Sequence, residues 1–187
     1  MSAVDDAIKD VGLAVTIIRS AGNIDTYAYV SPKIQKYHER DALFPTDSGV
    51  TDGDLLQTGN YSFLVRSIMR DERAGEFFMY RIKLFHCNAT IAVKEYNSTT
   101  KTFTTVKSNV PCCIIDDASA MSTSDRAVVM PGYAGRDNLY YLYVQSSAGI
   151  TKNSILVDEN NRSLRVSGSI NPYSAKGLLE VPVKLES

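Results

Sequence analysis

The sequence predicts an all-β protein, a small β-barrel or sandwich with a short N-terminal helix and one long irregular loop. Short segments rich in Val, Ile, Thr, Tyr and Phe recur along the chain, separated by turn residues at close spacing. Helical periodicity is confined to the N-terminal end. Hydrophobic residues make up 44% and charged residues 22% of the 187 residues, which is ordinary for a globular protein with a substantial core.

Residues 1–12 are expected to form the helix or an arm. Apolar residues recur at helical spacing from Val4 to Val11. Ser2 can cap the start of the helix, and Gly12 can end it. The segment lacks the basic start and apolar stretch of a signal peptide, and no apolar run long enough to cross a membrane occurs. We therefore expect neither export nor membrane insertion.

The expected strands begin directly after this helix. Two of them flank the turn residues Ala21-Gly22-Asn23 and predict a hairpin. The final strand alternates strictly between apolar and polar residues, and Pro182 within it is typical of an edge strand. The expected strands are Leu13–Arg19, Thr26–Val30, Asp54–Gln57, Tyr61–Arg70, Phe77–Cys87, Ala89–Tyr96, Thr102–Lys107, Val110–Ile115, Arg126–Met130, Leu139–Gln145, Ile155–Val157, Ser163–Val166 and Leu179–Leu185.

Residues 31–51 interrupt this pattern. The segment contains Pro32, Pro45 and Gly49 among mixed charges, and its apolar residues follow no period. A structureless connection of about 20 residues is unusual inside a compact domain and is typical of functional loops or arms. We therefore expect a long projecting loop at this point.

The sequence shows no sign of a division into separate domains. No internal repeat is recognised, and no segment rich in Ser, Gly or Pro divides the sequence. We therefore expect one β domain over residues 1–187, in which residues 110–187 supply additional β structure.

The residues that most often carry chemistry are scarce. The chain has 2 His and 3 Cys, and neither His38 nor His86 lies in a metal-binding motif. The aspartates around Asp52 and Asp54 do not have the spacing of a calcium loop and are better explained by a tight turn. The pattern therefore predicts no catalytic residues, no cofactor and no metal, and the protein is not expected to be an enzyme.

Tyrosine is the most informative residue type, because the chain has 11 Tyr and no Trp. Tyrosine is frequent in protein interfaces, since its ring is apolar and its hydroxyl forms hydrogen bonds. The alternative is that these rings complete a β core with their hydroxyls outward. As candidate subunit contacts we name Tyr133, Tyr140, Tyr141 and Tyr143, and Tyr27, Tyr29 and Tyr37 could line the same contacts.

The order of these features resembles the neck proteins of tailed bacteriophages, of the head-closure or stopper type. The resemblance covers about residues 13 to 96. The segments that carry it are Val15-Thr-Ile-Ile-Arg19, Asn23-Ile-Asp-Thr-Tyr-Ala-Tyr-Val-Ser-Pro32, Asp52-Gly-Asp-Leu-Leu-Gln-Thr-Gly-Asn-Tyr-Ser-Phe-Leu-Val65 and Tyr80-Arg-Ile-Lys-Leu-Phe-His-Cys-Asn-Ala-Thr-Ile-Ala-Val93.

The resemblance implies a small β-barrel whose long early loop projects toward a channel. Copies of such a protein form a ring that joins the portal or connector of the head to the tail and helps retain or gate DNA. Residues 31–51 would then be the gate or interface element. Its candidate residues are Lys33, Ile34, Lys36, Tyr37, His38, Glu39, Arg40, Leu43 and Phe44.

The expected role is therefore that of a structural virion protein. Its partners would be copies of itself in a ring, the portal or adaptor, and tail proteins. DNA would pass through without specific binding, which the net charge of -1 allows. It would reside in the neck of the virion, and in the host cytoplasm during assembly. The alternatives are a tail terminator, collar or tail-tube component and, in another class, a small β-barrel ligand-binding module or enzyme.

Overall fold

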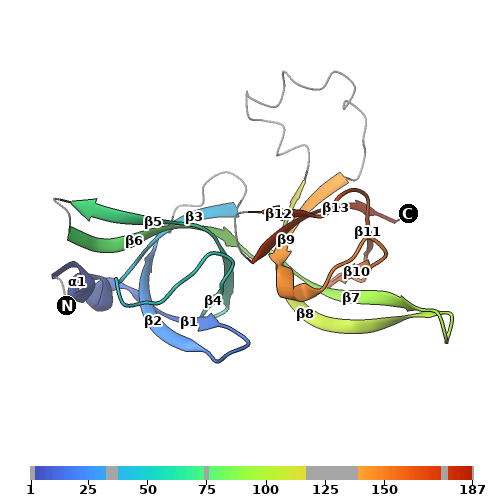
Figure 1. Ribbon diagram of the computed structural model, residues 1–187, viewed down its shortest axis with the longest axis horizontal. Coiled ribbons are helices and arrows are strands. Elements are labelled where there is room, and N and C mark those ends of the chain that lie inside the picture. Colours follow the sequence, from blue (N-terminus) through green and yellow to red (C-terminus); the bar gives the residue numbers. More distant parts are fainter. Residues whose placement is uncertain (1–2, 33–37, 74–75, 117–138, 174–176, 187) are drawn as a thin grey trace, which may run out of the picture. The chain divides into compact units, whose positions relative to one another are not determined.

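The computed structural model describes residues 3–32, 38–73, 76–116, 139–173 and 177–186. These residues form one α-helix, one short 3-10 helix and antiparallel β-strands (Figure 1). The chain divides into two compact units. The N-terminal unit comprises residues 1–87 and 173–178, and the C-terminal unit comprises residues 88–172 and 179–187.

The N-terminal unit is a closed six-stranded antiparallel barrel (blue to green in Figure 1). Its strands follow one another around the barrel in the order β1-β2-β3-β6-β5-β4. Alternate residues along each strand point inward and form one apolar core. The elements are α1 (Ala3–Val11), β1 (Leu13–Ile18), β2 (Ile24–Val30), β3 (Glu39–Phe44), β4 (Leu55–Thr58), β5 (Tyr61–Arg73) and β6 (Glu76–His86).

The C-terminal unit is a second six-stranded antiparallel barrel with its own core. Its strands run in the order β11-β10-β7-β8-β9-β13, and pairing of β11 with β13 closes it. A further strand, β12, is hydrogen-bonded to β13. The elements are β7 (Ala89–Asn97), β8 (Thr102–Asp116), β9 (Leu139–Gln145), the 3-10 helix η2 (Ser146–Ala148), β10 (Ile155–Asp158), β11 (Ser163–Val166), β12 (Asn171–Tyr173) and β13 (Leu178–Leu185).

The two barrels have the same topology. The first barrel runs β1-β2-β3-β6-β5-β4, and the second, started from β7, runs β7-β8-β9-β13-β11-β10. Each strand of one barrel therefore has a counterpart in the other, with β13 taking the place of β6. The prediction that the chain holds no internal repeat is wrong.

The repeat is visible in the sequence once the strands are aligned. β3 begins at Glu39 and β9 at Leu139, and the two segments then run in step as far as Thr58 and Asp158. Three of the matched pairs are identical, namely Gly49 and Gly149, Thr51 and Thr151, and Leu56 and Leu156. A fourth pair, Val50 and Ile150, is similar and buried in both barrels. So few matches escape recognition unless the pairing of the strands is known.

The turn after the third strand shows the same backbone design in both barrels. The backbone N–H of Thr51 donates to Oδ2 of Asp54 at 2.7 Å, and that of Thr151 donates to Oγ of Ser154 at 2.9 Å. In each turn the N–H of the later residue also donates back to the carbonyl of the threonine. An oxygen-bearing side chain three residues after the threonine thus holds both turns.

The unit boundary has no linker in the sequence. β6 ends at His86 and β7 begins at Ala89, so a connection of ordinary loop length separates the two barrels. The sequence predicts one β domain over residues 1–187, whereas the structure contains two compact units with separate cores. A short connection without a change in composition gives no signal of a boundary.

The predicted long loop at residues 31–51 is wrong for Glu39–Phe44, which form β3. This strand pairs with β2 on one side and β6 on the other. Ala42 and Phe44 point into the core, and Arg40 shares their face at the end of the strand, over the ring of Phe63. Glu39 and Asp41 are on the outer face. Outward Asp41 pairs with Lys83 of β6 at 2.5 Å. Charged residues on the outer face of a central strand concealed the alternation.

Other expectations are confirmed or corrected in detail. The all-β fold with a short N-terminal helix is confirmed, and α1 spans Ala3–Val11. The strands expected at 102–107 and 110–115 are one strand, β8, that bends at Asn109 with a φ of 54°. The edge position predicted from Pro182 is wrong, because β13 lies between β9 and β11 and closes the barrel. The strand expected at Arg126–Met130 lies outside the described residues.

Candidate functional site

The residues proposed for the gate loop are distributed over the wall of the N-terminal barrel. Lys33, Ile34, Lys36 and Tyr37 lie outside the described residues. His38 and Arg40 are half-buried, and Leu43 is half-buried on β3. The Phe44 side chain is fully buried in the core and is therefore removed from the candidate contact residues.

Two charged residues at the start of β3 bind neighbouring side chains of their own unit. Glu39 forms an ion pair with Arg66 of β5. Arg40 stacks over the ring of Phe63, with its guanidinium carbon 5.9 Å from the ring centre, and donates to the carbonyl of Ser31 at 3.3 Å. These contacts hold the start of the strand against the barrel.

His86, at the end of β6, packs against the same aromatic group. Its ring centre lies 5.3 Å from that of Phe63 and 5.6 Å from that of Tyr61. Burial lowers its pKa below the ordinary 6.5, and the charges of Arg40 and His38 lower it further. His86 therefore takes up a proton less readily than an exposed histidine, and its ring packs at the rim of the core.

Three of the tyrosines proposed as subunit contacts lie on one strand of the C-terminal barrel. Tyr27 and Tyr29 lie on β2 of the N-terminal barrel, and Tyr37 and Tyr133 are outside the described residues. Tyr140, Tyr141 and Tyr143 belong to β9 and are half-buried. The hydroxyl of Tyr143 donates to Oε2 of Glu180 on β13 at 2.9 Å. Tyr140 packs against the core. The rings of Tyr140 and Tyr143 thus contribute to the barrel itself.

Other aromatic residues are more exposed. The described residues that expose large apolar side chains include Val11, Leu13, Tyr27, Tyr29, Tyr61, Met69, Tyr96, Phe103 and Val106. Clusters of exposed apolar and aromatic residues are typical of surfaces that bind another protein. Of these, the sequence named Tyr27 and Tyr29 as possible contacts. It missed the others, because the outward direction of a side chain depends on the strand register.

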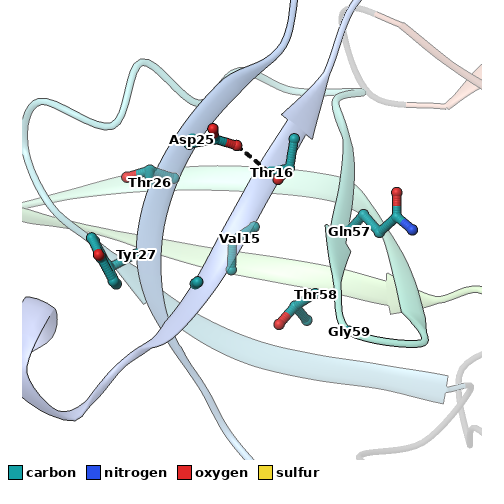
Figure 2. A pocket seen from close by; sticks show the side chains of 9 residues that line it. Val15, Thr16, Asp25, Thr26, Tyr27, Gln57, Thr58 and Gly59 are labelled. Atoms are coloured by element: carbon teal, nitrogen blue, oxygen red, sulfur yellow. Dashed lines mark hydrogen bonds between the residues drawn. The ribbon is translucent and has the colours of Figure 1, made fainter.

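In the N-terminal unit, a hollow lies on the outer face of β1. Figure 2 shows β1 between Tyr27 of β2 on one side and Gln57 and Thr58 of β4 on the other. Ala14 and Thr16 are small residues on the outward side of β1, so the space above them is open. The hollow has a volume of about 430 Å³. We call it the β1 hollow, and its lining residues are Ala14, Val15, Thr16, Asp25, Thr26, Tyr27, Gln57, Thr58 and Gly59.

In the C-terminal unit, the β7–β8 hairpin extends beyond the part of β7 that pairs with β10. Tyr96 and Phe103 are directly opposite each other on its two strands. Their ring centres are 5.5 Å apart in an edge-to-face arrangement, and the side chains are 53% and 43% exposed. A groove of about 600 Å³ beside them is lined by Glu95, Tyr96, Phe103, Thr151, Lys152, Asn153, Ile155 and Arg165. We call this region the aromatic hairpin surface.

The two surfaces carry different charges. Lys94, Lys101 and Lys152 lie on or beside the aromatic hairpin surface. Asp25 lines the β1 hollow, and the exposed Asp10 lies on α1, which contacts β2. Arg165 and Glu95 also line the groove of the aromatic hairpin surface, so basic residues outnumber acidic ones there, whereas Asp25 is the charged residue that lines the β1 hollow.

The described residues contain no group of three or more His, Cys, Asp or Glu side chains placed to hold a metal ion. Cys112 and Cys113 are buried and Cys87 is half-buried, and none of the three is in a disulfide. Among the helices in the described part of the chain, none has the length and apolar character needed to cross a membrane.

Comparison with known proteins gives no assignment for this arrangement. No protein family matches the chain, and neither a characterised protein nor a solved structure is detectably similar to it.

Proposed function

We propose that this protein is a structural component of a tailed-bacteriophage particle, a ring-forming neck or head-closure protein between the connector and the tail. The observation that carries the proposal is the pair of exposed, aromatic surfaces on its two barrels. Tyr and Phe that are exposed in the isolated chain are typical of residues that become buried in an assembly. The neck position itself rests on the resemblance of residues 13–96.

The tandem barrels support an assembly role. A chain with two similar units offers two sets of outer strands to its neighbours. Extended hairpins such as β7–β8 can reach past the wall of their own barrel, and they supply contacts between copies without disturbing the core. Copies that associate through two different surfaces can close into a ring.

The experiment is native mass spectrometry of the full chain, alone and mixed with the connector protein of the same particle. We expect a closed oligomer, formed by the chain alone or on the connector. A protein that stays monomeric under both conditions would contradict the proposal.

The position in the particle needs a second measurement. Cryo-electron microscopy of particles carrying a tagged copy of the chain should show the label between head and tail. Label at the far end of the tail, or along its length, would instead support a tail-terminator or tail-tube role. A label outside the channel axis would support a collar.

A further inference from the structure

We propose that the aromatic hairpin surface of one copy inserts into the β1 hollow of a second copy. This inference rests on the proposed function, because it identifies the surfaces through which copies of the chain would associate. Its partner is a second copy of this chain, joined head to tail.

The two repeats differ at this hairpin. β7 corresponds to β1, because Val93 and Ile17 take the same partner, Leu156 and Leu56, in the next strand. Glu95 is therefore the counterpart of Arg19, which lies just beyond the end of β1. The C-terminal barrel continues the paired hairpin further, to Asn97. The extension with its two exposed rings is specific to one repeat, so it is not required by the fold.

The aromatic hairpin surface and the β1 hollow have complementary shapes. Tyr96 and Phe103 form a compact apolar projection on a two-stranded ribbon. The β1 hollow has a floor of small side chains, Ala14 and Thr16, and a wall that includes Tyr27. A volume of about 430 Å³ suits one or two aromatic rings. Aromatic side chains that enter such hollows commonly carry most of the binding energy.

The two surfaces also carry complementary charges. Lys101 lies in the turn of the hairpin and is exposed, and Lys152 lines the adjoining groove. Asp25 at the hollow is exposed and accepts a hydrogen bond from Thr16 at 2.8 Å. Lys101, Lys152 and Arg165 outnumber Glu95 around the projection, and the hollow carries Asp25, so contact between these two surfaces is favoured over contact of either surface with itself. The result is a head-to-tail association, the type that closes into rings.

The test uses two variants of the full chain. The hairpin variant carries Tyr96→Ser and Phe103→Ser, and the hollow variant carries Ala14→Arg. All three positions are exposed, so both variants should keep the fold, which circular dichroism checks. We expect each variant alone to self-associate at least about tenfold more weakly than the wild type in sedimentation velocity. The matched control is Met69→Ala, at an exposed apolar position on another strand, and it should associate normally.

Mixing the two variants makes the test specific. The hairpin variant keeps an intact hollow, and the hollow variant keeps an intact hairpin. A head-to-tail contact therefore predicts a one-to-one heterodimer that grows no further. A hollow variant that assembles normally while the hairpin variant does not would indicate contact between two hairpins, and it overturns the inference.

The remaining outcomes separate this inference from the proposed function. Normal assembly of both variants overturns the inference and leaves the ring-forming role standing. A wild-type chain that remains monomeric alone and with the connector overturns both. Restoration of association in a chain that combines Lys101→Asp with Asp25→Lys, after each change alone weakens it, would support the charge pairing.

Discussion

The two barrels hold the same turn with different electrostatics. In the N-terminal barrel, Asp54 accepts hydrogen bonds from the backbone of Thr51 at 2.7 Å and from Nε of Arg19 at 2.8 Å. In the C-terminal barrel, Ser154 replaces the aspartate and binds the equivalent backbone at 2.9 Å. Glu95, the counterpart of Arg19, accepts from Thr151 instead at 3.4 Å. The repeats thus retain a backbone geometry and not a particular charge.

Their cores differ in a compensating way. On the third strand, the inward pair is Ala42 and Phe44 in the first barrel and Leu142 and Val144 in the second. A small and a large residue in one barrel are replaced by two of intermediate size in the other. Since cores tolerate changes that conserve total volume, the two sequences can diverge widely around one fold. The two repeats therefore share their strand topology and total core volume, whereas most of their residues differ.

The largest loss of stability should follow from changing the leucine that occupies the same position in each core. Leu56 and Leu156 are 1% and 0% exposed. Leu56→Ala and Leu156→Ala should each lower the free energy of unfolding by about 3 kcal/mol, through lost burial and the cavity left behind. Urea denaturation measures both losses, and the exposed Gln57→Ala is the control. A large loss of unfolding free energy in only one of the two leucine variants would contradict the structural equivalence of Leu56 and Leu156.

The same two variants test the expectation of one β domain. If the units unfold together, each variant shifts a single transition. If they unfold separately, each variant shifts only the transition of its own unit. Tyrosine fluorescence and circular dichroism that coincide throughout would support a single cooperative domain.

The next effect concerns a turn that the barrels do not share. Asp158 is buried, and it accepts from the N–H of Asn160 at 2.9 Å, the N–H of Arg162 at 2.8 Å and Nε of Arg162 at 2.7 Å. Asp158→Ala should cost about 2 kcal/mol, because three hydrogen bonds to a carboxylate are lost. The loss should appear in urea denaturation at about pH 7.

The stability lost in Asp158→Ala should depend on pH, which provides the control. Burial opposes the charge of Asp158, but the hydrogen bonds from Arg162 and Asn160 outweigh burial and lower the pKa below the ordinary 3.8. A lowered carboxyl pKa contributes stability above the unfolded-state value, and that stability is lost as the pH falls through the folded-state value. The difference between wild type and variant should therefore shrink in acid. A constant difference would mean that the carboxylate charge is not responsible.

A smaller effect is expected at the glycines of the shared turn. Gly49 and Gly149 have φ angles of 66° and 70°, in the left-handed region. A Cβ at Gly149 would meet nothing within 4 Å, and one at Gly49 only a side-chain carbon at 3.9 Å. Alanine at either position should therefore cost about 1 kcal/mol from backbone strain alone. Asparagine, which tolerates this conformation, should cost less in both turns, and the reverse order would contradict the explanation.

The smallest expected effect is a pH dependence of stability that His86 gives to the N-terminal barrel alone. His86 has a pKa below 6.5 in the folded chain, so the unfolded chain binds the proton more readily. The N-terminal unit should therefore lose stability as the pH falls through about 6.5. Leu185 occupies the corresponding place in the C-terminal barrel, because it pairs with Leu164 as His86 pairs with Phe63. His86→Leu should remove that part of the pH dependence, measured by the denaturation midpoint at several pH values. An unchanged profile would show that another group titrates.

Local pattern predicted much of this molecule. The helix at residues 3–11, the hairpin between the first two strands and the strand at Leu139–Gln145 follow from periodicity and turn residues alone. β3 was missed because its outer face carries Glu39 and Asp41 and its inner face has Arg40 beside only two apolar residues, Ala42 and Phe44. The alternation is too short to stand out between Pro45 and the preceding segment.

The candidate surfaces were less accessible to sequence reasoning. Tyr140, Tyr141 and Tyr143 belong to one strand and are half-buried, while Tyr27 and Tyr96 are exposed. All five occur in similar apolar strands, so composition does not separate them. What separates them is which neighbouring strand covers each ring.

The sequence by itself determined the class of fold, because alternation and turn residues act over a few neighbouring positions. The number of barrels, the repeat and the outward aromatic surfaces were decided only by the tertiary structure. These depend on which strands pair and in what register, and the pairing of β1 with β4 or of β11 with β13 joins residues far apart in the chain. A shift of one residue in register would move every side chain of a strand to the other face.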